Sequence, residues 1–366
     1  MMCVLTSLGC ISQDTDSGHY VDTGTPIKIV VKDFFATDEC FYAAASEVVC
    51  FDWEGNIIWD TPIMGTSFFV FLEDAIFVDT YDISEDTFGV ALLSLEGEIL
   101  WQKELGLMGA SSIGASEGLL VAGSVEGKNN VLWAFSKTGD VLWTYNHFAR
   151  INQVLVSPDG SCVIFNDYVH SVSCVRNGDR VWSHDVGRVS TGYRNRVLAF
   201  APDSSYLVYG SEKDYRRIVV ATPDGDEVWS HPLEGPLQSV IITDDSEYIL
   251  AGSFGTVYKF TRDGTLVWEH DVGINIEYLA ITPDADYIAA GSLGLPSALI
   301  VLNRNGEVLW KARSFDTIFA VAISPDGSHV AFSNRLHQLF ILPNPPEKST
   351  AQSIIYLTPH YSCNPY

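Results

Sequence analysis

One short motif, Gly-x-x-x-Trp, occurs seven times along this chain, and its tryptophans are 39 to 47 residues apart. A self-similar period of about 40 residues indicates stacked copies of one supersecondary unit. Because each unit can bury its apolar faces only against the next one, this repeat constrains the architecture more than any other feature. The tryptophans are Trp59, Trp101, Trp143, Trp182, Trp229, Trp268 and Trp310.

Residues 151–186 show what one unit contains. Four short runs rich in Val, Ile, Phe and Cys are separated by Pro-Asp-Gly, Asn-Asp and Asn-Gly-Asp. Short apolar runs bounded by turn residues are typical of β-strands, and no run shows the period of a helix. We therefore expect a four-stranded antiparallel meander, and we call its strands A to D from the inside of the fold outward.

A second recurring pattern marks the turn between strands A and B. In its fullest form, Ser-Pro-Asp-Gly, Pro presets φ, Asp bonds its own backbone and Gly permits positive φ. The pattern or an equivalent turn occurs eight times, once more than Gly-x-x-x-Trp. The sequence therefore predicts an all-β, eight-bladed β-propeller of four-stranded antiparallel blades, with seven blades as the alternative. The turns are residues 36–39, 72–75, 115–118, 157–160, 201–204, 243–246, 282–285 and 324–327.

The eighth unit, residues 318–342, lacks a Gly-x-x-x-Trp strand and runs into the sequence PNPPEKST. An open array of blades would leave a sheet edge exposed, so another segment must supply the fourth strand. Two segments can do this: residues 353–357 (SIIYL) from the C-terminal side, or the segment around residues 19–21 from the N-terminal side.

The repeated tryptophans are expected to be packing elements. A large ring at the start of each outer strand can dock into the neighbouring blade and bury roughly 200 Å². Equivalent tryptophans on successive blades are more consistent with such contacts than with a ligand cage.

The motifs also carry a resemblance to known repeats. Gly-x-x-x-Trp at the C–D turn resembles the tryptophan-docking repeat of quinoprotein-like (PQQ-like) β-propellers. The Ser-Pro-Asp-Gly turn, followed by an apolar strand and Gly-Ser (VLVSPDGSCVIF, YILAGS, YIAAGS), resembles WD40-type repeats, and the mixture resembles prokaryotic surface propellers. The resemblance covers about residues 28–342 and implies a fold, because propellers host many unrelated activities. It implies a scaffold more than a dehydrogenase, since the chain has no adjacent cysteine pair of the kind found in catalytic quinoproteins.

Charge narrows the range of partners. The chain has 46 acidic and 21 basic residues, which gives a net charge of −25. Such a chain is a poor match for nucleic acid, because phosphate contacts require a basic surface. The charge favours solubility in salt or an extracellular setting. No apolar run reaches the length of about 18 residues that a membrane span requires, so we expect no transmembrane segment.

The N-terminus has its own pattern. The stretch MMCVLTSLGC is followed by a polar run rich in Ser, Thr, Asp and Gly. This start resembles the end of a lipoprotein signal, which implies a lipid anchor at Cys10; the alternative is a flexible start. We expect residues 1–26 to form this segment, residues 27–357 a single propeller domain and residues 358–366 a C-terminal tail. The expected location is the cell surface or the extracellular space, with the cytoplasm as the alternative.

Two cysteine pairs, Cys40 with Cys50 and Cys162 with Cys174, each bracket an expected B–C hairpin. Residues equidistant from the turn of an antiparallel hairpin lie opposite one another, close to the separation that a disulfide needs. We therefore predict two cross-strand disulfides if the protein is exported. The alternative is that all four are buried thiols, which behave as small apolar side chains.

Several short motifs resemble chemical sites but lack the context that such sites need. Residues 114–118 (GASEG) match the nucleophile-elbow pattern, but a strand follows where that motif needs a helix. His184, His231 and His270 occupy equivalent positions on separate blades, too far apart to share a metal. Residues 14–18 hold a fragment of a calcium loop without its later ligands. We expect no catalytic, metal or cofactor site, with calcium the one ion left open.

One interval departs from the repeat. From Trp182 to Ala201 there are 19 residues, where the equivalent intervals are 13 or 14. The extra residues fall in the loop between blades 4 and 5, and residues 188–217 hold six basic and three acidic residues. Arginine and tyrosine are favoured at interface hot spots, so we predict an anion- or partner-binding patch; the alternative is a solvated loop that balances nearby acids. The patch comprises Arg188, Tyr193, Arg194, Arg196, Lys213, Tyr215, Arg216 and Arg217.

Taken together, these features predict a non-catalytic, monomeric propeller that binds a protein or a glycan through loops on one face. Two alternatives stay open. One is an enzyme, quinoprotein-like or a hydrolase or lyase, whose site is assembled in the central channel from several blades. The other is a structural module of a surface array.

Overall fold

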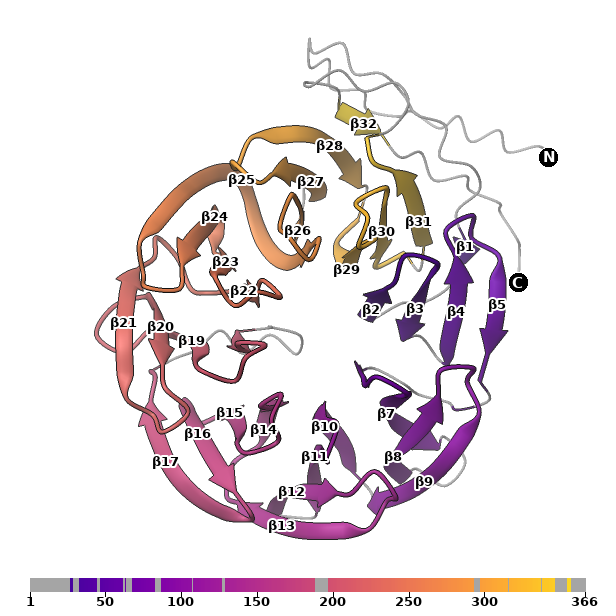
Figure 1. Ribbon diagram of the computed structural model, residues 1–366, viewed down its shortest axis with the longest axis vertical. Coiled ribbons are helices and arrows are strands. Elements are labelled where there is room, and N and C mark those ends of the chain that lie inside the picture. The colour runs from indigo at the N-terminus through magenta and orange to yellow at the C-terminus, as the bar shows by residue number, and fades with distance from the viewer. Residues whose placement is uncertain are drawn as a thin grey trace, which may run out of the picture.

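The structure is a computed structural model. It describes residues 27–28, 33–44, 47–61, 63, 68–82, 87–106, 108–126, 129–187, 197–292, 297–314, 316–336, 338–345 and 354–356. Every regular element in these ranges is a β-strand. The strands form a ring of four-stranded antiparallel sheets around a central channel (Figure 1). The predicted all-β propeller is confirmed, and its sheets divide into eight blades.

Blades 1 to 4 each use four consecutive strands in chain order. They are β2 (Asp33–Ala36), β3 (Cys40–Ala44), β4 (Val48–Asp52) and β5 (Ile57–Asp60); β6 (Phe69–Phe71), β7 (Ala75–Asp82), β8 (Thr87–Ser94) and β9 (Ile99–Gly106); β10 (Met108–Ser116), β11 (Leu119–Glu126), β12 (Asn129–Phe135) and β13 (Val141–His147); β14 (Ile151–Val156), β15 (Val163–Asp167), β16 (Ser171–Arg176) and β17 (Asp179–Asp185).

Blades 5 to 8 continue the pattern, with one strand, β25, shared between blades 6 and 7. They are β18 (Leu198–Phe200), β19 (Leu207–Ser211), β20 (Arg217–Ala221) and β21 (Glu227–Pro232); β22 (Ser239–Ile242), β23 (Tyr248–Gly252), β24 (Phe254–Thr261) and β25 (Leu266–Ile281); the second half of β25, β26 (Tyr287–Ser292), β27 (Ser297–Asn303) and β28 (Val308–Ser314); β29 (Ile318–Ile323), β30 (His329–Asn334), β31 (Gln338–Pro343) and β1 (Ile27–Lys28).

The ring is closed from the N-terminal side. Strand β1 pairs antiparallel with β31, with Ile27 opposite Leu339, and completes blade 8. Figure 1 shows this blade beside blade 1, where the two ends of the colour scale meet. The closing residues are 27–28, and the predicted segment around residues 19–21 lies outside the described residues.

The prediction that residues 353–357 complete blade 8 is wrong. Strand β32 (Ile354–Tyr356) instead pairs in parallel with β28, as a fifth strand outside blade 7. The physical reason is that β1 already occupies the outer edge of β31. The C-terminal strand therefore adds to the next available outer edge, which covers backbone groups that would otherwise be an open sheet edge.

Burial follows the radial position of each strand. The second strands β3 and β15 are buried at every residue, the innermost strands β2 and β14 are only partly buried, and the outer strand β9 is mostly exposed or half-buried. The apolar residues gather in clusters between neighbouring blades, for example where blade 1 meets blade 8 and where it meets blade 2. The core is thus a ring of inter-blade contacts, which explains why no single repeat could bury its faces alone.

The Gly-x-x-x-Trp motif makes one contact in each direction around the ring. The glycine lies in the C–D turn with positive φ and receives the tryptophan of the preceding blade: a Cβ on Gly97 would lie 2.6 Å from the ring of Trp59. The indole Nε1 of Trp101 donates to Lys137 O at 2.9 Å in the next C–D turn. Six such ring–glycine pairs occur: Trp59–Gly97, Trp101–Gly139, Trp143–Gly178, Trp182–Gly225, Trp229–Gly264 and Trp268–Gly306.

The predicted cross-strand disulfides are absent, and all four cysteines are buried free thiols. The hairpin register differs from the expected one by two residues, so Cys50 lies opposite Tyr42 and Cys174 opposite Ile164. The members of each pair are therefore diagonal neighbours across the hairpin and not directly opposite one another. Burial, and then hydrogen bonding to Cys40, raises the pKa of the Cys50 thiol, which keeps it protonated and unreactive.

Candidate binding face

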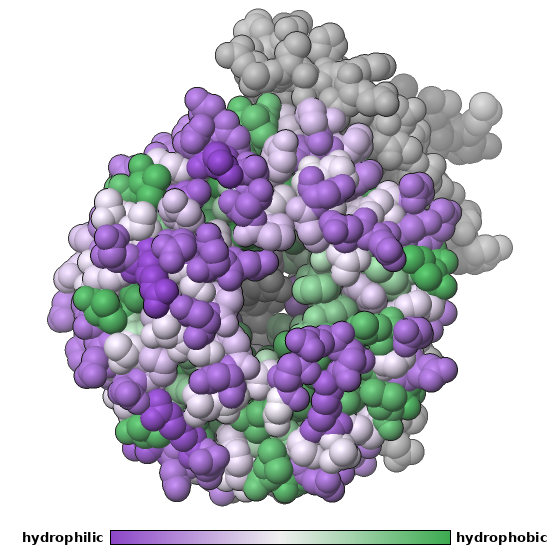
Figure 2. Space-filling model, viewed as in Figure 1, coloured by the Kyte–Doolittle hydropathy of each residue, from purple (hydrophilic) through white to green (hydrophobic). Residues whose placement is uncertain are grey.

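The antiparallel blades give the ring two faces of different construction. The A–B and C–D turns lie at one end of the strands and form the AB/CD face. The B–C turns and the D–A loops lie at the other end and form the BC/DA face. Figure 2 shows one face of the molecule hollowed at its centre, where the channel opens.

The described half of the predicted patch lies on the BC/DA face. Lys213, Tyr215 and Arg216 belong to the B–C turn of blade 5, and Arg217 begins β20. This turn packs on the loop that arrives from blade 4, because the backbone N–H groups of Glu212 and Lys213 donate to Val186 O at 2.7 and 3.0 Å. The remaining predicted residues, Arg188, Tyr193, Arg194 and Arg196, lie outside the described residues.

Each described cation of the patch has an acidic partner. Lys213 Nζ lies 3.1 Å from Asp185 Oδ2, and Arg216 Nε lies 3.8 Å from Glu212 Oε2. Ion pairs at this level of exposure contribute about 0–1 kcal/mol, so they can exchange for the carboxylates of a partner at little cost.

Arg217 is held more firmly than the other two cations. Its guanidinium donates to Glu227 Oε1 at 3.1 Å and to Ser230 Oγ at 3.1 Å, and its Cζ lies 5.5 Å from the centre of the Tyr215 ring. It therefore acts as a support for Tyr215, whose side chain is 51% exposed.

Sequence reasoning missed three exposed aromatic residues on the same face. Phe148 is 74% exposed in the D–A loop before blade 4, Tyr168 is 37% exposed in the B–C turn of blade 4, and Phe254, the first residue of β24 in blade 6, is 65% exposed. With Tyr215 of blade 5 they form an aromatic arc over three neighbouring blades. Exposed aromatic groups are favoured anchors of protein interfaces. No repeat motif marks these positions; the signal was a large aromatic residue inside a polar turn.

Buried hydrogen bonds hold the blade 4 part of the arc. His147 Nε2 lies 2.8 Å from Asp167 Oδ2, and the side chains of this pair are 2% and 0% exposed. Asp167 also accepts from the backbone N–H of Val169 and Ser171 and from Ser171 Oγ at 2.6 Å. Burial would raise the pKa of the Asp167 carboxyl, but the hydrogen bonds from His147 and Ser171 outweigh it and lower that pKa. The turn that presents Tyr168 is thus rigid.

The position of Phe254, the blade 6 residue of the aromatic arc, depends on a glycine in the neighbouring loop. Gly235, in the D–A loop from blade 5, lies so close to Phe254 that a Cβ at this position would overlap the Phe254 side chain. Only glycine lets the loop pack on this turn, and the contact keeps the Phe254 ring on the outside. Each end of the arc is therefore positioned by contacts beneath it.

The described histidines and Ser116 do not assemble a site, and residues 14–18 lie outside the described residues. His184 stacks on Trp182 and its Nδ1 lies 3.1 Å from Tyr209 Oη, while His231 Nδ1 lies 2.7 Å from Pro232 O. Burial lowers the pKa of His184. Ser116 ends β10 and is followed by another strand. No group of three or more His, Cys, Asp or Glu side chains within the described ranges is placed to hold a metal ion. Within the same ranges, no helix could span a membrane.

Comparison with known proteins gives matches of two kinds. Residues 166–322 match the family described as outer membrane protein assembly factor BamB. No curated protein matches the sequence. Among solved structures, BamB from Moraxella catarrhalis matches with a TM-score of 0.61 and 18% identity, covering 80% of this chain and 90% of that chain.

Two other solved structures have the same architecture. The C-terminal WD40 domain of Sif2 matches with a TM-score of 0.68 and 12% identity, covering 87% of this chain and 97% of that chain. Chaetomium thermophilum Sqt1, bound to the N-terminus of a ribosomal protein, matches with a TM-score of 0.65 and 12% identity, covering 86% and 97%. At these identities the likeness establishes the fold alone.

Proposed function

We propose that this PQQ-like and WD40-like β-propeller is a non-catalytic scaffold that binds a partner protein through the aromatic arc and the cations beside it. The observation that carries the proposal is the arc itself: Phe148, Tyr168, Tyr215 and Phe254 are exposed at the BC/DA ends of three neighbouring blades. Aromatic anchors on a rigid support lose little conformational entropy on binding, which is why they dominate interface energetics.

The chemistry of the arc indicates the kind of surface it fits. The flanking side chains include Lys213 and Arg216, although the chain as a whole has a net charge of −25. A partner with an apolar centre and carboxylates at its rim would match both features. The bidentate geometry of arginine suits such carboxylates.

The proposed setting is the cell envelope. The matching family is described as an outer membrane protein assembly factor, and the sequence MMCVLTSLGC resembles a lipoprotein signal end with Cys10 as its anchor. We place the propeller at the cell surface or outside the cell, as a monomer tethered by its N-terminal segment. Acidic surfaces keep such proteins soluble and monomeric.

The experiment uses the full chain and two variants as baits in cell-envelope extract, read by quantitative mass spectrometry. The arc variant carries Tyr215→Ala with Phe254→Ala, and the control carries Val141→Ala with Leu142→Ala, two exposed apolar residues on an outer strand. The affinity of the captured partner, measured with purified proteins, should fall at least about tenfold for the arc variant and stay unchanged for the control.

A charge-reversal variant, Arg194→Glu with Arg216→Glu, tests the basic part of the patch in the same way. We expect weaker binding and a smaller dependence of the affinity on salt. A partner retained equally by all variants would contradict the proposed site. Binding of a glycan alone, detected on a carbohydrate array, would contradict the choice of a protein partner.

A further inference from the structure

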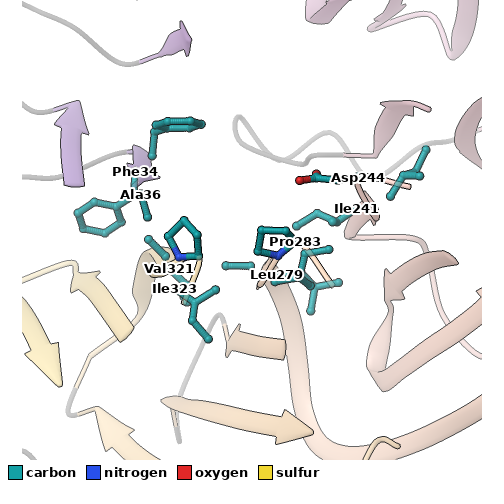
Figure 3. Close-up of a pocket in the computed structure, with 14 residues that line it drawn as sticks. Phe34, Ala36, Ile241, Asp244, Leu279, Pro283, Val321 and Ile323 are labelled. Carbon is teal, nitrogen blue, oxygen red and sulfur yellow. The ribbon is translucent and has the colours of Figure 1, made fainter. Parts of the chain in front are cut away.

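The central channel holds a cavity of about 350 Å³ at the end where the A–B turns lie. Four consecutive blades line it: 6, 7, 8 and 1. Thirteen of the fourteen side chains that line it are apolar, although polar atoms, mostly of the backbone, form nearly half of its exposed wall, and Figure 3 shows Leu279, Pro283 and Ile323 around the open space. A cavity of this size, lined by apolar side chains, can take one large apolar side chain.

One carboxylate interrupts the apolar wall. Blades 4, 5, 7 and 8 place a proline directly before the turn aspartate, but blade 6 places Asp244 there. The neighbouring Asp245 accepts from Thr243 Oγ1 at 2.6 Å, whereas no hydrogen bond to the Asp244 carboxylate is found within the described part of the chain. Figure 3 shows Asp244 reaching in from the blade 6 side. Partial burial, and then the charge of Asp245, raises the pKa of the Asp244 carboxyl.

The mouth of the cavity lies inside a ring of negative charge. Each of the eight A–B turns carries at least one exposed carboxylate. Cations nearby are already paired, as Arg262 is with Asp203 and Arg304 with Asp286. The turn carboxylates are Asp38, Glu39, Glu73, Asp74, Glu117, Asp159, Asp203, Asp244, Asp245, Asp284 and Asp326.

We infer that this mouth of the channel binds a basic peptide segment of a partner protein, with one apolar side chain in the cavity and a neighbouring lysine or arginine on Asp244. The inference is independent of the aromatic arc, which lies on the opposite face. The apolar side chains of the wall accept the apolar residue of the peptide. The exposed Asp244 carboxylate, to which no described residue donates a hydrogen bond, is open to a cation at the mouth.

The arrangement selects a peptide over smaller cations. A small amphiphilic cation would reach Asp244 and leave the carboxylates of the other blades unused. An extended chain with several lysines or arginines can reach several turns at once, and every additional pair speeds its diffusional encounter. The apolar cavity explains why a purely hydrophilic polycation would be the poorer ligand.

The test uses the full chain and three fluorescein-labelled peptides, with affinity measured by fluorescence anisotropy at about 150 mM NaCl. The peptides are GKRKFKRKG, its serine counterpart GKRKSKRKG and its acidic counterpart GEDEFEDEG. We expect the phenylalanine peptide to bind at least about tenfold more tightly than the serine peptide. The acidic peptide should not bind.

Two variants with the same change of charge locate the site. Asp244→Asn should weaken binding of GKRKFKRKG about fivefold, whereas Asp214→Asn on the BC/DA face should change it less than about twofold. Equal affinities for the phenylalanine and serine peptides, or equal effects of the two variants, would overturn the inference. Spermine binding as tightly as GKRKFKRKG would overturn it as well. None of these outcomes bears on the aromatic arc, whose test uses different variants.

Discussion

The AB/CD face and the BC/DA face are built from the same strands but differ in how their turns are held. On the AB/CD face the turns repeat one arrangement, in which a Ser or Thr hydroxyl donates to the turn aspartate. It occurs in blades 4, 6, 7 and 8, from Ser157 to Asp159, Thr243 to Asp245, Thr282 to Asp284 and Ser324 to Asp326, at 2.6 to 2.8 Å. Neighbouring turns are also linked, since Asp159 N donates to Ser204 Oγ at 3.0 Å.

On the BC/DA face the segments of blades 4, 5 and 6 are each held by a different contact. A buried His147–Asp167 pair supports blade 4, the Val186 carbonyl supports blade 5, and close packing of Gly235 supports blade 6. Turns that share one hydrogen-bonding scheme cannot change in sequence without losing that scheme. Loops that are each held by their own contact can change in sequence one residue at a time. The variable face therefore suits a partner that is recognised through individual side chains, whereas the regular face presents the repeated ring of carboxylates.

The largest expected effect is on the regular face. Gly264 has φ +91°, and a Cβ there would lie 2.8 Å from the Trp229 ring. Gly264→Val should lower the free energy of unfolding by about 3 kcal/mol, because it adds backbone strain and displaces the ring. Denaturant unfolding measures the change.

Gly118→Val, in an A–B turn of the same face, is the matched control. A Cβ at Gly118 would meet nothing within 4 Å, so the loss should stay below about 0.5 kcal/mol. Equal losses in the two variants would show that ring contact with the C–D glycine is not what stabilises this face.

A smaller loss is expected from the buried pair on the variable face. Asp167→Asn removes the charge that accepts from His147, Ser171 and Val169, and should cost about 2 kcal/mol of unfolding free energy. Asp214→Asn, an exposed change of the same kind in the next blade, should be close to neutral. If both are neutral, the pair does not hold the loop that presents Tyr168.

The same carboxylate predicts a pH dependence. Its pKa in the folded protein is lowered, so its contribution to stability is complete above the unfolded-state pKa and is lost as pH falls through the lower folded-state value. Between about pH 5 and pH 3 the wild-type protein should lose about 1 kcal/mol more unfolding free energy than Asp167→Asn. Parallel pH profiles of the two proteins would contradict this assignment.

The smallest effect concerns the cysteines. Because Cys40, Cys50, Cys162 and Cys174 are free thiols, a reducing agent should change the melting temperature by less than about 1 °C, since a lost disulfide would cost several degrees. Peptide mapping after alkylation in denaturant should recover all four as alkylated residues. A peptide in which Cys162 is linked to Cys174 would restore the original disulfide prediction.

Much of the fold could be predicted because its determinants are local. Pro-Asp-Gly turns and short apolar runs act within a few residues, so counting them gave the strand order and the eight blades. The candidate site was predicted only in part. The long interval after Trp182 led to the prediction of Lys213, Tyr215 and Arg216 as binding residues. Isolated aromatic residues such as Phe254 belong to no repeated sequence pattern, so they were not predicted.

The sequence by itself determined the repeat, the strand order within each blade and the residue types of the turns, because these depend on contacts within one unit. Only the tertiary structure decided which segment closes blade 8, how Cys50 and Cys174 align with their partner strands, and which turns stand side by side on each face. It also brought Phe35 of blade 1 and Asp244 of blade 6 to the same cavity. Closure of the ring brings together residues that are far apart in the sequence, and no local sequence pattern indicates those contacts.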